Sequence, residues 1–389
     1  MPAPPGSRRL DTAERPLVLI WELTQACGLA CNHCRANARP QCHPQELTTA
    51  QGKGLLEDAR EFGDGQLVVL SGGDPLVRDD VEALIEYGTE LGHRMTITPS
   101  GTGSLTRARI DGLADAGLKR MALSLDGASA ESHDAFRGEA GSFEETVRAI
   151  EDANAAGIPV QINTTVCGQT VDELPAIREL LGELGVVMWS VFFLVPIGRG
   201  RILEPLAPEK ADAVMDWLRT VSETEPFGVK TTEAPQYRRV CLQHESNASN
   251  DGPATTGDDH AAGLRRRRGI VAGDGFAFVS HTGEVFPSGF LPKSAGNVRK
   301  QSVTELYRDS DLFRSLRDRD QLTGKCGACE YRHVCGGSRS RAFAYFDDPL
   351  ASDPLCPYMT EGYDGPLPWN DTTQPPTPPS GPTALTDAD

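Results

Sequence analysis

The chain lacks the long apolar runs that mark membrane and secreted proteins. None of its 389 residues lies in a stretch approaching 18 consecutive apolar residues, so the sequence predicts no membrane-spanning helix. Its N-terminus, MPAPPGSRR, has no apolar segment of the kind found in secretory signals. We therefore expect a cytoplasmic protein, in which ten cysteines indicate metal ligands rather than disulfides.

Lysine is also scarce, and the chain carries a strong excess of negative charge. Only seven of the 38 basic residues are lysine, against 55 aspartates and glutamates, and the net charge is −17. This excess disfavours nucleic acids and anionic membranes as partners. It also suggests a halophilic source, because carboxylates stay hydrated in strong salt. The alternative is the preference of a GC-rich genome for arginine.

Composition divides the chain into five parts. We predict a flexible N-terminal arm over residues 1–15, a first domain over 16–240, a flexible insertion over 241–268, a second domain over 269–362 and a disordered tail over 363–389. The insertion ends in four arginines, Arg265–Arg268. They are either a solvated basic turn or a clamp for the carboxylates of a polyanionic substrate.

Short apolar strands alternate with amphipathic helices in the first domain. Six strands are predicted at Leu17–Leu23, Gln66–Ser71, Arg94–Thr98, Met121–Leu125, Val160–Thr165 and Val186–Leu194. Helices are predicted at Thr48–Phe62, Asp79–Leu91, Thr106–Ala116, Ser142–Ala156 and Val171–Glu183, the fourth with a capping-box sequence at Ser142–Glu145. This alternation predicts an α/β domain with a parallel sheet, either an open barrel or a doubly wound sheet.

Three cysteines, Cys27, Cys31 and Cys34, follow the first predicted strand at C-x3-C-x2-C spacing. Thiolates this close in sequence can bind one centre, and cysteine thiolates hold [4Fe–4S] clusters. Because such a cluster has four irons, three cysteines leave one iron free to bind a substrate or cofactor. The alternatives are a zinc site with three cysteines and buried thiols without a ligand.

Polar or glycine-containing turns follow the other predicted strands. They are Ser71–Pro75, Thr98–Gly101, Ser124–Gly127, Asn163–Val166 and Leu194–Gly200. In a parallel sheet these turns lie at the carboxyl ends of the strands, where barrels and open sheets carry their active sites. The turns and the three-cysteine loop are therefore expected to form one site, which favours a barrel.

The three-cysteine loop after the first strand resembles the signature of the radical SAM superfamily, and the resemblance extends from residue 16 to about residue 200. It implies a partial (β/α)6 TIM-like barrel. It also implies that Cys27, Cys31 and Cys34 hold a [4Fe–4S] cluster whose open iron chelates S-adenosylmethionine. Reductive cleavage would yield a 5′-deoxyadenosyl radical that abstracts hydrogen from substrate, with ferredoxin or flavodoxin as electron donor.

The same resemblance assigns the glycine-rich turn to the cofactor. Gly72, Gly73, Asp74 and Pro75 are similar to the GGEP motif, whose backbone meets the methionine amino group, although Asp stands in place of the commoner Glu. Glycines let the backbone approach a ligand that any Cβ would block.

Other strand-end residues are implied in cofactor binding. Ser124 and Asp126 stand where the family contacts ribose and carboxylate, and Asn163 and Thr165 are candidates of the same kind. Arg137 would pair with the methionine carboxylate or form a surface ion pair. The ring of His33, a position often aromatic in the family, would stack on adenine or lie on a helix surface.

A second group of cysteines lies near the C-terminus: Cys326, Cys329, Cys335 and Cys356. The C-x2-C-x5-C part resembles SPASM/Twitch extensions, which implies a small cysteine-rich SPASM/Twitch-like domain with one auxiliary [4Fe–4S] cluster. Four thiolates would also suffice for zinc. A hairpin of Phe276–Ser280 with Glu284–Phe286 and a helix over Val303–Arg317 are predicted before this group. Cys42, Cys167 and Cys241 have no assigned role.

The run from Gly324 to Ala342 is similar to SPASM-type enzymes that modify tetrapyrrole side chains in haem biosynthesis, as are Gly296–Arg299 and Asp353–Cys356. The resemblance implies a tetrapyrrole-like small molecule as substrate. A peptide-modifying enzyme is the alternative, which the fifteen residues before Pro16 disfavour because they are too short for a peptide-binding domain. An interpretation of another class is a non-catalytic iron–sulfur or zinc protein, and the complete cysteine motif argues against it.

Overall fold

The computed structural model describes residues 11–250 and 270–377. Its strands form one sheet in the order β10–β9–β8–β1–β2–β3–β4–β5–β6–β7. The parallel strands are β1 Val18–Thr24, β2 Leu67–Gly72, β3 Arg94–Ile97, β4 Arg120–Ser124, β5 Val160–Val166, β6 Met188–Phe193 and β7 Gly228–Thr232. On the other side of β1, β8 (Phe276–Val279) is also parallel to it. β7 and β10 end the sheet, so the barrel is open.

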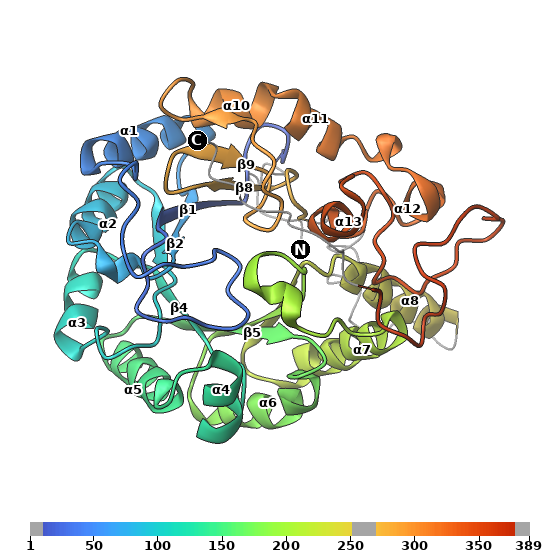
Figure 1. Cartoon of the computed structure of the whole chain (residues 1–389), viewed down its shortest axis with the longest axis horizontal. Coiled ribbons are helices and arrows are strands. Elements are labelled where there is room, and N and C mark those ends of the chain that lie inside the picture. Colours follow the sequence, from blue (N-terminus) through green and yellow to red (C-terminus); the bar gives the residue numbers. More distant parts are fainter. Residues whose placement is uncertain (1–10, 251–269, 378–389) are drawn as a thin grey trace, which may run out of the picture.

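Helices surround the curved sheet on its outer side (Figure 1). They are α1 Thr49–Ala59, α2 Val81–Glu90, α3 Arg107–Asp115, α4 Ala130–Arg137, α5 Ser142–Ala155, α6 Leu174–Glu183, α7 Pro208–Thr224 and α8 Gln236–Asn250. Short 3-10 helices lie at Arg60–Phe62, Pro75–Val77 (η2), Val171–Glu173, Gly198–Ile202 (η4) and Arg319–Gln321. In the described ranges, no helix combines the length and the apolar character needed to cross a membrane.

Alternation along the strands gives the sheet two different faces. Trp21 and Trp189 are fully buried on the helix side, where Trp189 packs edge-to-face on Trp217 of α7 at 6.0 Å. The intervening side chains face the interior of the barrel, because successive side chains of a strand point to opposite faces. On β5 these interior residues, Gln161 and Asn163 among them, are half-buried, while their neighbours in the strand are buried. The interior is therefore accessible and partly polar.

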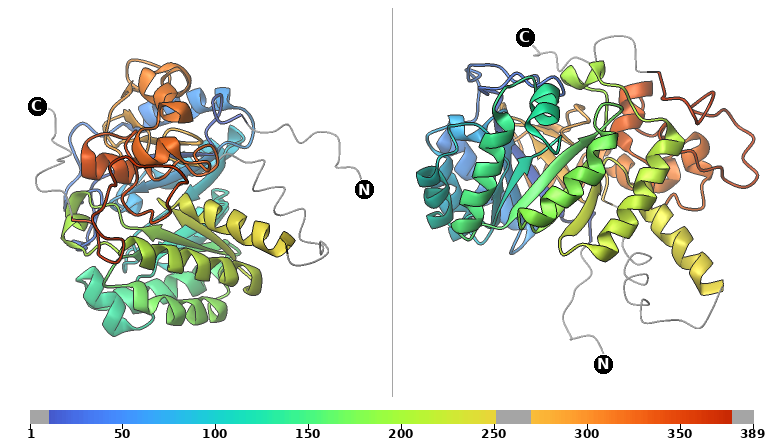
Figure 2. Two further views of the ribbon diagram at one scale, coloured as in Figure 1. Left: turned by 90° about the vertical axis from the view of Figure 1, so that its right-hand side faces the viewer. Right: turned by 90° about the horizontal axis from the view of Figure 1, so that it is seen from below.

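The six predicted strands are all present, but the sheet continues beyond them. β7 was not among the predicted strands, and α8 extends through Asn250. The flexible insertion predicted over 241–268 is therefore wrong for residues 241–250, since Val240, Cys241 and Leu242 of α8 are buried. The end of α8 projects from the molecule (Figure 2). Arg265–Arg268 lie outside the described residues.

Two helix predictions need correction. The capping box expected at Ser142–Glu145 does not form. The N-cap residue is Gly141, Asp134 Oδ1 accepts from Phe143 N at 2.8 Å instead, and Ser142 Oγ lies 3.3 Å from His133 Nε2. α4 was not predicted, and its own capping box is made by Ser129 and Ser132.

The N-terminal arm and the tail are also more ordered than expected. Tyr307 OH donates to the carbonyl of Thr12 at 2.5 Å, and Arg15 Nη2 donates to the carbonyl of Asp64 at 2.8 Å. The prediction of a flexible arm is thus wrong for residues 11–15. In the tail, the ring of Trp369 lies 3.6 Å from Lys325 Nζ, so the prediction of disorder is wrong for residues 363–377.

The C-terminal region begins with the predicted hairpin of β8 and β9 (Glu284–Phe286), to which the two-residue strand β10 (Gly296–Asn297) pairs. The helix predicted over Val303–Arg317 is broken at Ser310 into α10 (Val303–Asp309) and α11 (Asp311–Arg317), because the Ser310 side chain caps α11. Two further helices, α12 (Gly324–Ala328) and α13 (Arg339–Phe346), follow. They lie on the same side of the molecule as α8 in Figure 1, and residues of α8 and α12 line one cavity.

A buried ion pair fixes this region against the barrel. Arg341 and Asp353 are 1% and 0% exposed, and their side chains are 3.1 Å apart. Arg341 Nε and Nη2 also donate to the carbonyls of Leu194 and Phe193 at the end of β6. Asp353 accepts hydrogen bonds from Gln236 Nε2 at 2.6 Å and Ser338 N at 2.7 Å. The pair thus joins β6, α8 and the cysteine-rich region.

Candidate active site

The three-cysteine loop begins directly after β1, at the carboxyl end of the sheet. Cys27 and Cys31 are buried and Cys34 is half-buried, and the three pack together with Leu29 and Ala38. The backbone N–H of Leu29 points at Cys27 Sγ (3.3 Å) and that of Ala38 at Cys34 Sγ (3.4 Å). Such hydrogen bonds to sulfur stabilise thiolates and tune iron–sulfur clusters.

Among residues 11–250 and 270–377, no three His, Cys, Asp or Glu side chains converge closely enough to hold a single metal ion. The cysteine sulfurs of an iron–sulfur cube stand further apart than the ligands of one ion, since each binds a different iron. Three clustered thiols with N–H donors, and a guanidinium 3.5 Å from Cys31 Sγ, fit such a cluster.

The Gly72–Gly73 turn packs directly against the backbone that leads into this loop. Gly73 N donates to Thr24 O at 2.8 Å and Asp74 N to Ala26 O at 2.7 Å. A Cβ on Gly73 would lie 2.4 Å from Ala26 O, and one on Gly72, whose φ is +154°, would lie 2.4 Å from Thr24 O. The glycines are therefore required for the close approach of two backbones.

Asp74 shapes the turn from its inner side. The carboxylate accepts from Leu76 N at 3.1 Å and Ser100 N at 3.4 Å, and it caps η2, whose first residue is Pro75. Burial raises the pKa of Asp74. Ser100 lies 3.3 Å from Cys27 Sγ and donates to Gly73 O. Ser100 was not singled out from the sequence, although it lies in the predicted turn Thr98–Gly101.

Asp126, Arg137 and His33 form a charged cluster beside the cysteines. Arg137 Nε lies 3.2 Å from Asp126 Oδ2, and its Nη1 donates to Cys31 Sγ at 3.5 Å. His33 Nε2 lies 3.9 Å from the same Asp126 oxygen, and the imidazole stacks on Phe136 at 4.7 Å. Arg137 is thus buried beside the three-cysteine loop and does not form a surface ion pair.

The ionisation of this cluster follows from its burial. Burial opposes the charge of Asp126, but the guanidinium of Arg137 holds its pKa below the usual range. Burial lowers the pKa of His33 to about 4, and that of His133 also to about 4. The cluster therefore contains a carboxylate, a guanidinium and neutral imidazoles.

Two buried polar atoms near the loop have no hydrogen-bond partner in the described part of the chain. They are His33 Nδ1 and Arg199 Nη2. Buried polar groups are normally paired, so these atoms fit a polar ligand that supplies donors and acceptors. The hydroxyl, amino and carboxylate groups of S-adenosylmethionine are of that kind.

Ser124 and Asn163 are register partners on β4 and β5. Both are half-buried and lie on the interior side, and Asn163 Oδ1 accepts from Gln161 Nε2 at 2.7 Å. Thr165 N donates to Asp126 Oδ1 at 2.7 Å. The strand-end residues therefore line the wall of the barrel next to the charged cluster.

Arg199 is a residue of the site that the sequence did not single out. From η4, its Nε donates to Cys31 O at 2.9 Å and its Nη1 to Ala38 O at 3.1 Å. Gly198 has a φ of +54°, and a Cβ there would lie 2.4 Å from Arg35 O. The signal was the Gly-Arg-Gly sequence within the predicted turn Leu194–Gly200.

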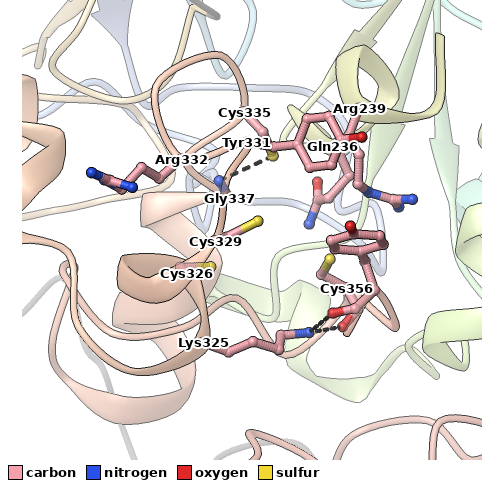
Figure 3. A pocket seen from close by; sticks show the side chains of 12 residues that line it. Gln236, Arg239, Lys325, Cys326, Cys329, Tyr331, Arg332, Cys335, Gly337 and Cys356 are labelled. Carbon is pink, nitrogen blue, oxygen red and sulfur yellow. Dashed lines mark hydrogen bonds between the residues drawn. The ribbon is translucent and has the colours of Figure 1, made fainter. Parts of the chain in front are cut away.

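The second cysteine group surrounds a separate cavity at the C-terminal region (Figure 3). Cys326, Cys335 and Cys356 are buried and Cys329 is half-buried, and all four line the cavity. Asp353 N donates to Cys326 Sγ and Gly337 N to Cys335 Sγ, each at 3.4 Å, the second shown in Figure 3. The sequence-predicted ligands are thus brought together.

Cations surround this cavity as well. Lys325, Arg239 and Arg332 line it, and Lys325 Nζ donates to the carbonyls of Cys356 and Tyr358. Burial raises the pKa of the Cys356 thiol to about 12, an effect that Lys325 and Arg239 oppose. Four thiolates around an iron–sulfur core carry a net negative charge, and nearby N–H donors and cations would compensate it, so the lining fits such a cluster.

The three remaining cysteines lie apart from both groups in their contacts. Cys42 is exposed, Cys167 packs with Leu194 and Leu203, and burial raises the pKa of Cys241 in α8 to about 11. None of these observations assigns them a role.

Comparison with known proteins agrees with this arrangement. Residues 21–181 match the model of the radical SAM superfamily. An AdoMet-dependent heme synthase of Methanosarcina barkeri is 40% identical over 343 residues, which cover 88% of this chain and 97% of that protein. The chain therefore belongs to the radical SAM superfamily, whose enzymes use S-adenosylmethionine and a [4Fe–4S] cluster.

Two further proteins are similar to this chain. The pre-heme d1 synthase of Dinoroseobacter shibae is 31% identical over 381 residues, which cover 94% of this chain and 91% of the relative. The crystal structure of Streptococcus suis SuiB bound to precursor peptide SuiA has a TM-score of 0.66 at 17% identity, covering 89% of this chain and 76% of that one. The structural likeness confirms the fold, a partial barrel with a SPASM/Twitch-type extension.

Proposed function

We propose that this radical SAM enzyme modifies the side chains of a tetrapyrrole in haem-type biosynthesis. The observation that carries the proposal is the 40% identity to an AdoMet-dependent heme synthase along 97% of that protein. The half-buried, partly polar residues on the interior face of the barrel, such as Gln161 and Asn163, would contact a small-molecule substrate. A peptide substrate is an outcome that the experiment below can reveal.

In the proposed site, Cys27, Cys31 and Cys34 hold the first cluster, which supplies an electron for the cleavage of S-adenosylmethionine when both are bound. The backbone of Gly72–Pro75 positions the methionine amino group. Arg137 and Asp126 provide a guanidinium and a carboxylate beside the cluster for the polar groups of the cofactor.

Ser124 and Asn163 contact the ribose or the substrate from the wall of the barrel. Cys326, Cys329, Cys335 and Cys356 hold one auxiliary [4Fe–4S] cluster in a domain that covers residues 270–362. Ferredoxin or flavodoxin supplies electrons, and the enzyme acts in the cytoplasm. The charge excess of the chain suggests that it works at high salt concentration.

Anaerobic reconstitution tests the proposal. Reconstituted protein should contain about eight irons per chain, as two cubes require. With dithionite and S-adenosylmethionine it should release 5′-deoxyadenosine, and with an iron tetrapyrrole that carries propionate side chains it should yield a product of changed mass. Conversion of an acidic peptide but not of the tetrapyrrole would overturn the proposed substrate. Zinc in place of iron, with no cofactor cleavage, would overturn the enzyme assignment.

A further inference from the structure

Three basic side chains lie toward the amino-terminal end of the barrel interior. They are Arg94 at the start of β3, Arg120 at the start of β4 and Lys230 on β7. Their neighbours in sequence, Met95 and Met121, are fully buried in the core on the helix side. Because side chains alternate between the two faces of a strand, the three cations lie on the interior side.

The register of the strands brings these cations toward one another. Arg120 reaches across β5 to β6, where its Nη1 lies 3.7 Å from Met188 Sδ. Met188 pairs with Gly228 of β7, and Lys230 pairs with Ser190 two residues further along the same strands. The cations are therefore held around one end of the interior by β3, β4 and β7.

No carboxylate within the described ranges forms an ion pair with any of the three. By contrast, other basic residues of the interior are paired, such as Arg35 with Glu22 at 3.0 Å and Arg137 with Asp126. Burial and the charge of Arg94 lower the pKa of Arg120, and enclosure by the barrel followed by the charge of Arg120 lowers the pKa of Lys230 to about 8. The three positive charges therefore repel one another. This unpaired group stands in a chain whose net charge is −17.

Solvent still reaches this group of cations, because the side chains of Arg94 and Lys230 are exposed. A ligand can therefore contact the cations. Between them and the three-cysteine loop, the interior wall carries the half-buried apolar pair Ile20 and Val69, which are register partners on β1 and β2. An apolar wall that ends in cations suits a flat apolar molecule with acidic side chains.

We propose that Arg94, Arg120 and Lys230 form a carboxylate-binding subsite, which holds peripheral carboxylates of the substrate at the end of the barrel opposite the cysteines. This inference rests on the proposed function, because a tetrapyrrole with propionate side chains is the carboxylate source that it names. Guanidinium and ammonium groups bind carboxylates by charge-assisted hydrogen bonds. If the subsite holds the carboxylates on one edge of the tetrapyrrole, a side chain on the opposite edge of the tetrapyrrole faces the cofactor.

Equilibrium binding of iron coproporphyrin III tests the subsite without turnover, by titration of the porphyrin absorption band. Arg120→Gln and Lys230→Gln should each weaken binding roughly 10-fold or more, because each removes a hydrogen bond to a charged group. Lys53→Gln, on the outer face at Tyr87, is the matched control and should bind as the wild type does. The methyl ester of the same porphyrin should bind all four proteins equally.

The variants should keep or gain thermal stability without ligand, because they relieve repulsion; a purely structural role for these cations would instead lower it. Wild-type affinity in both Gln variants would overturn the subsite and leave the proposed function standing. Failure of the wild type to bind the porphyrin would overturn both. The protein could instead bind an acidic peptide, with an affinity that the same two substitutions weaken. That result would support the carboxylate subsite and overturn the tetrapyrrole as substrate.

Discussion

Arg137 and Asp126 form an ion pair at the end of β4, with 3.2 Å between Nε and Oδ2, and the two side chains are 10% and 1% exposed. Arg137 also donates to Cys31 Sγ, so one guanidinium compensates a carboxylate and contacts a proposed cluster ligand. A buried charge that loses its partner is strongly unfavourable. Loss of this ion pair should therefore affect both the stability of the fold and the environment of Cys31.

We expect Arg137→Met to lower the free energy of unfolding of the iron-free protein by roughly 3–5 kcal/mol, because Asp126 is left charged and buried. The double variant Arg137→Met/Asp126→Asn should regain part of this loss. Urea unfolding under reducing conditions measures both. Equal losses in the single and double variants would mean that the two residues are not coupled.

Gly73→Ala should prevent the three-cysteine loop from adopting its position. The added Cβ would meet Ala26 O at 2.4 Å and Gln25 O at 2.6 Å, and backbone atoms cannot move aside as a flexible side chain can. We expect loss of first-cluster iron and of 5′-deoxyadenosine formation. Iron analysis after reconstitution checks this.

Gly54→Ala is the matched control for that experiment. Nothing lies within 4 Å of the Cβ position of Gly54, and alanine favours a helix such as α1 by about 0.5–1 kcal/mol over glycine. Its iron content should equal that of the wild type. A Gly73→Ala protein with full iron content and full activity would contradict the role assigned to the glycine turn.

The strands β1 to β6 were predictable because each is a short apolar run that ends in a turn. The two cysteine groups and the glycine turn were predictable because their spacing is local. β7 was missed because Gly228–Thr232 is largely polar and lies at the edge of the sheet. Arg199 and Ser100 could not be assigned, since their partners, Cys31 and Cys27, are distant in sequence. Contacts between residues so far apart in sequence form only when the chain is folded.

The buried pair of Arg341 and Asp353 should hold the cysteine-rich region on the barrel. Arg341→Met leaves Asp353 without its cation, and we expect a loss of roughly 3–5 kcal/mol in stability. Arg219→Met is the control, because the half-buried Arg219 pairs with the solvent-accessible carboxylates of Asp216 and Glu223, and such surface pairs contribute about 0–1 kcal/mol. Thermal unfolding with limited proteolysis measures both effects. Similar unfolding of the two variants would contradict the joining role of Arg341.

Substitution in the second cysteine group should separate cofactor cleavage from product formation. Cys329→Ala removes a proposed ligand of the auxiliary cluster without touching the three-cysteine loop. We expect 5′-deoxyadenosine to form while the modified substrate does not. Cys31→Ala, in contrast, should abolish 5′-deoxyadenosine as well. A wild-type yield of product from Cys329→Ala would reduce the auxiliary site to a structural role.

Substrate binding should depend on pH through Lys230. Its pKa in the folded protein is about 8, below the 10.5 of a free lysine. The side chain therefore loses its charge as the pH rises through about 8, and affinity for the carboxylated porphyrin should fall over that range. The charge that acts on Lys230 is that of Arg120, and the charge of Arg94 acts in turn on Arg120.

The same shift fixes the sign of the effect on stability. Between about pH 8 and 10.5 the unfolded chain binds more protons at Lys230 than the folded chain does, so the ligand-free protein should become more stable relative to a Lys230→Arg variant as the pH rises. Porphyrin affinity should show the opposite trend and weaken with pH in the wild type only, because arginine remains charged. Dissociation constants measured from about pH 6.5 to 10 at constant ionic strength test this. An identical decline in Lys230→Arg would place the titrating group elsewhere, since nothing at position 230 would then lose a proton.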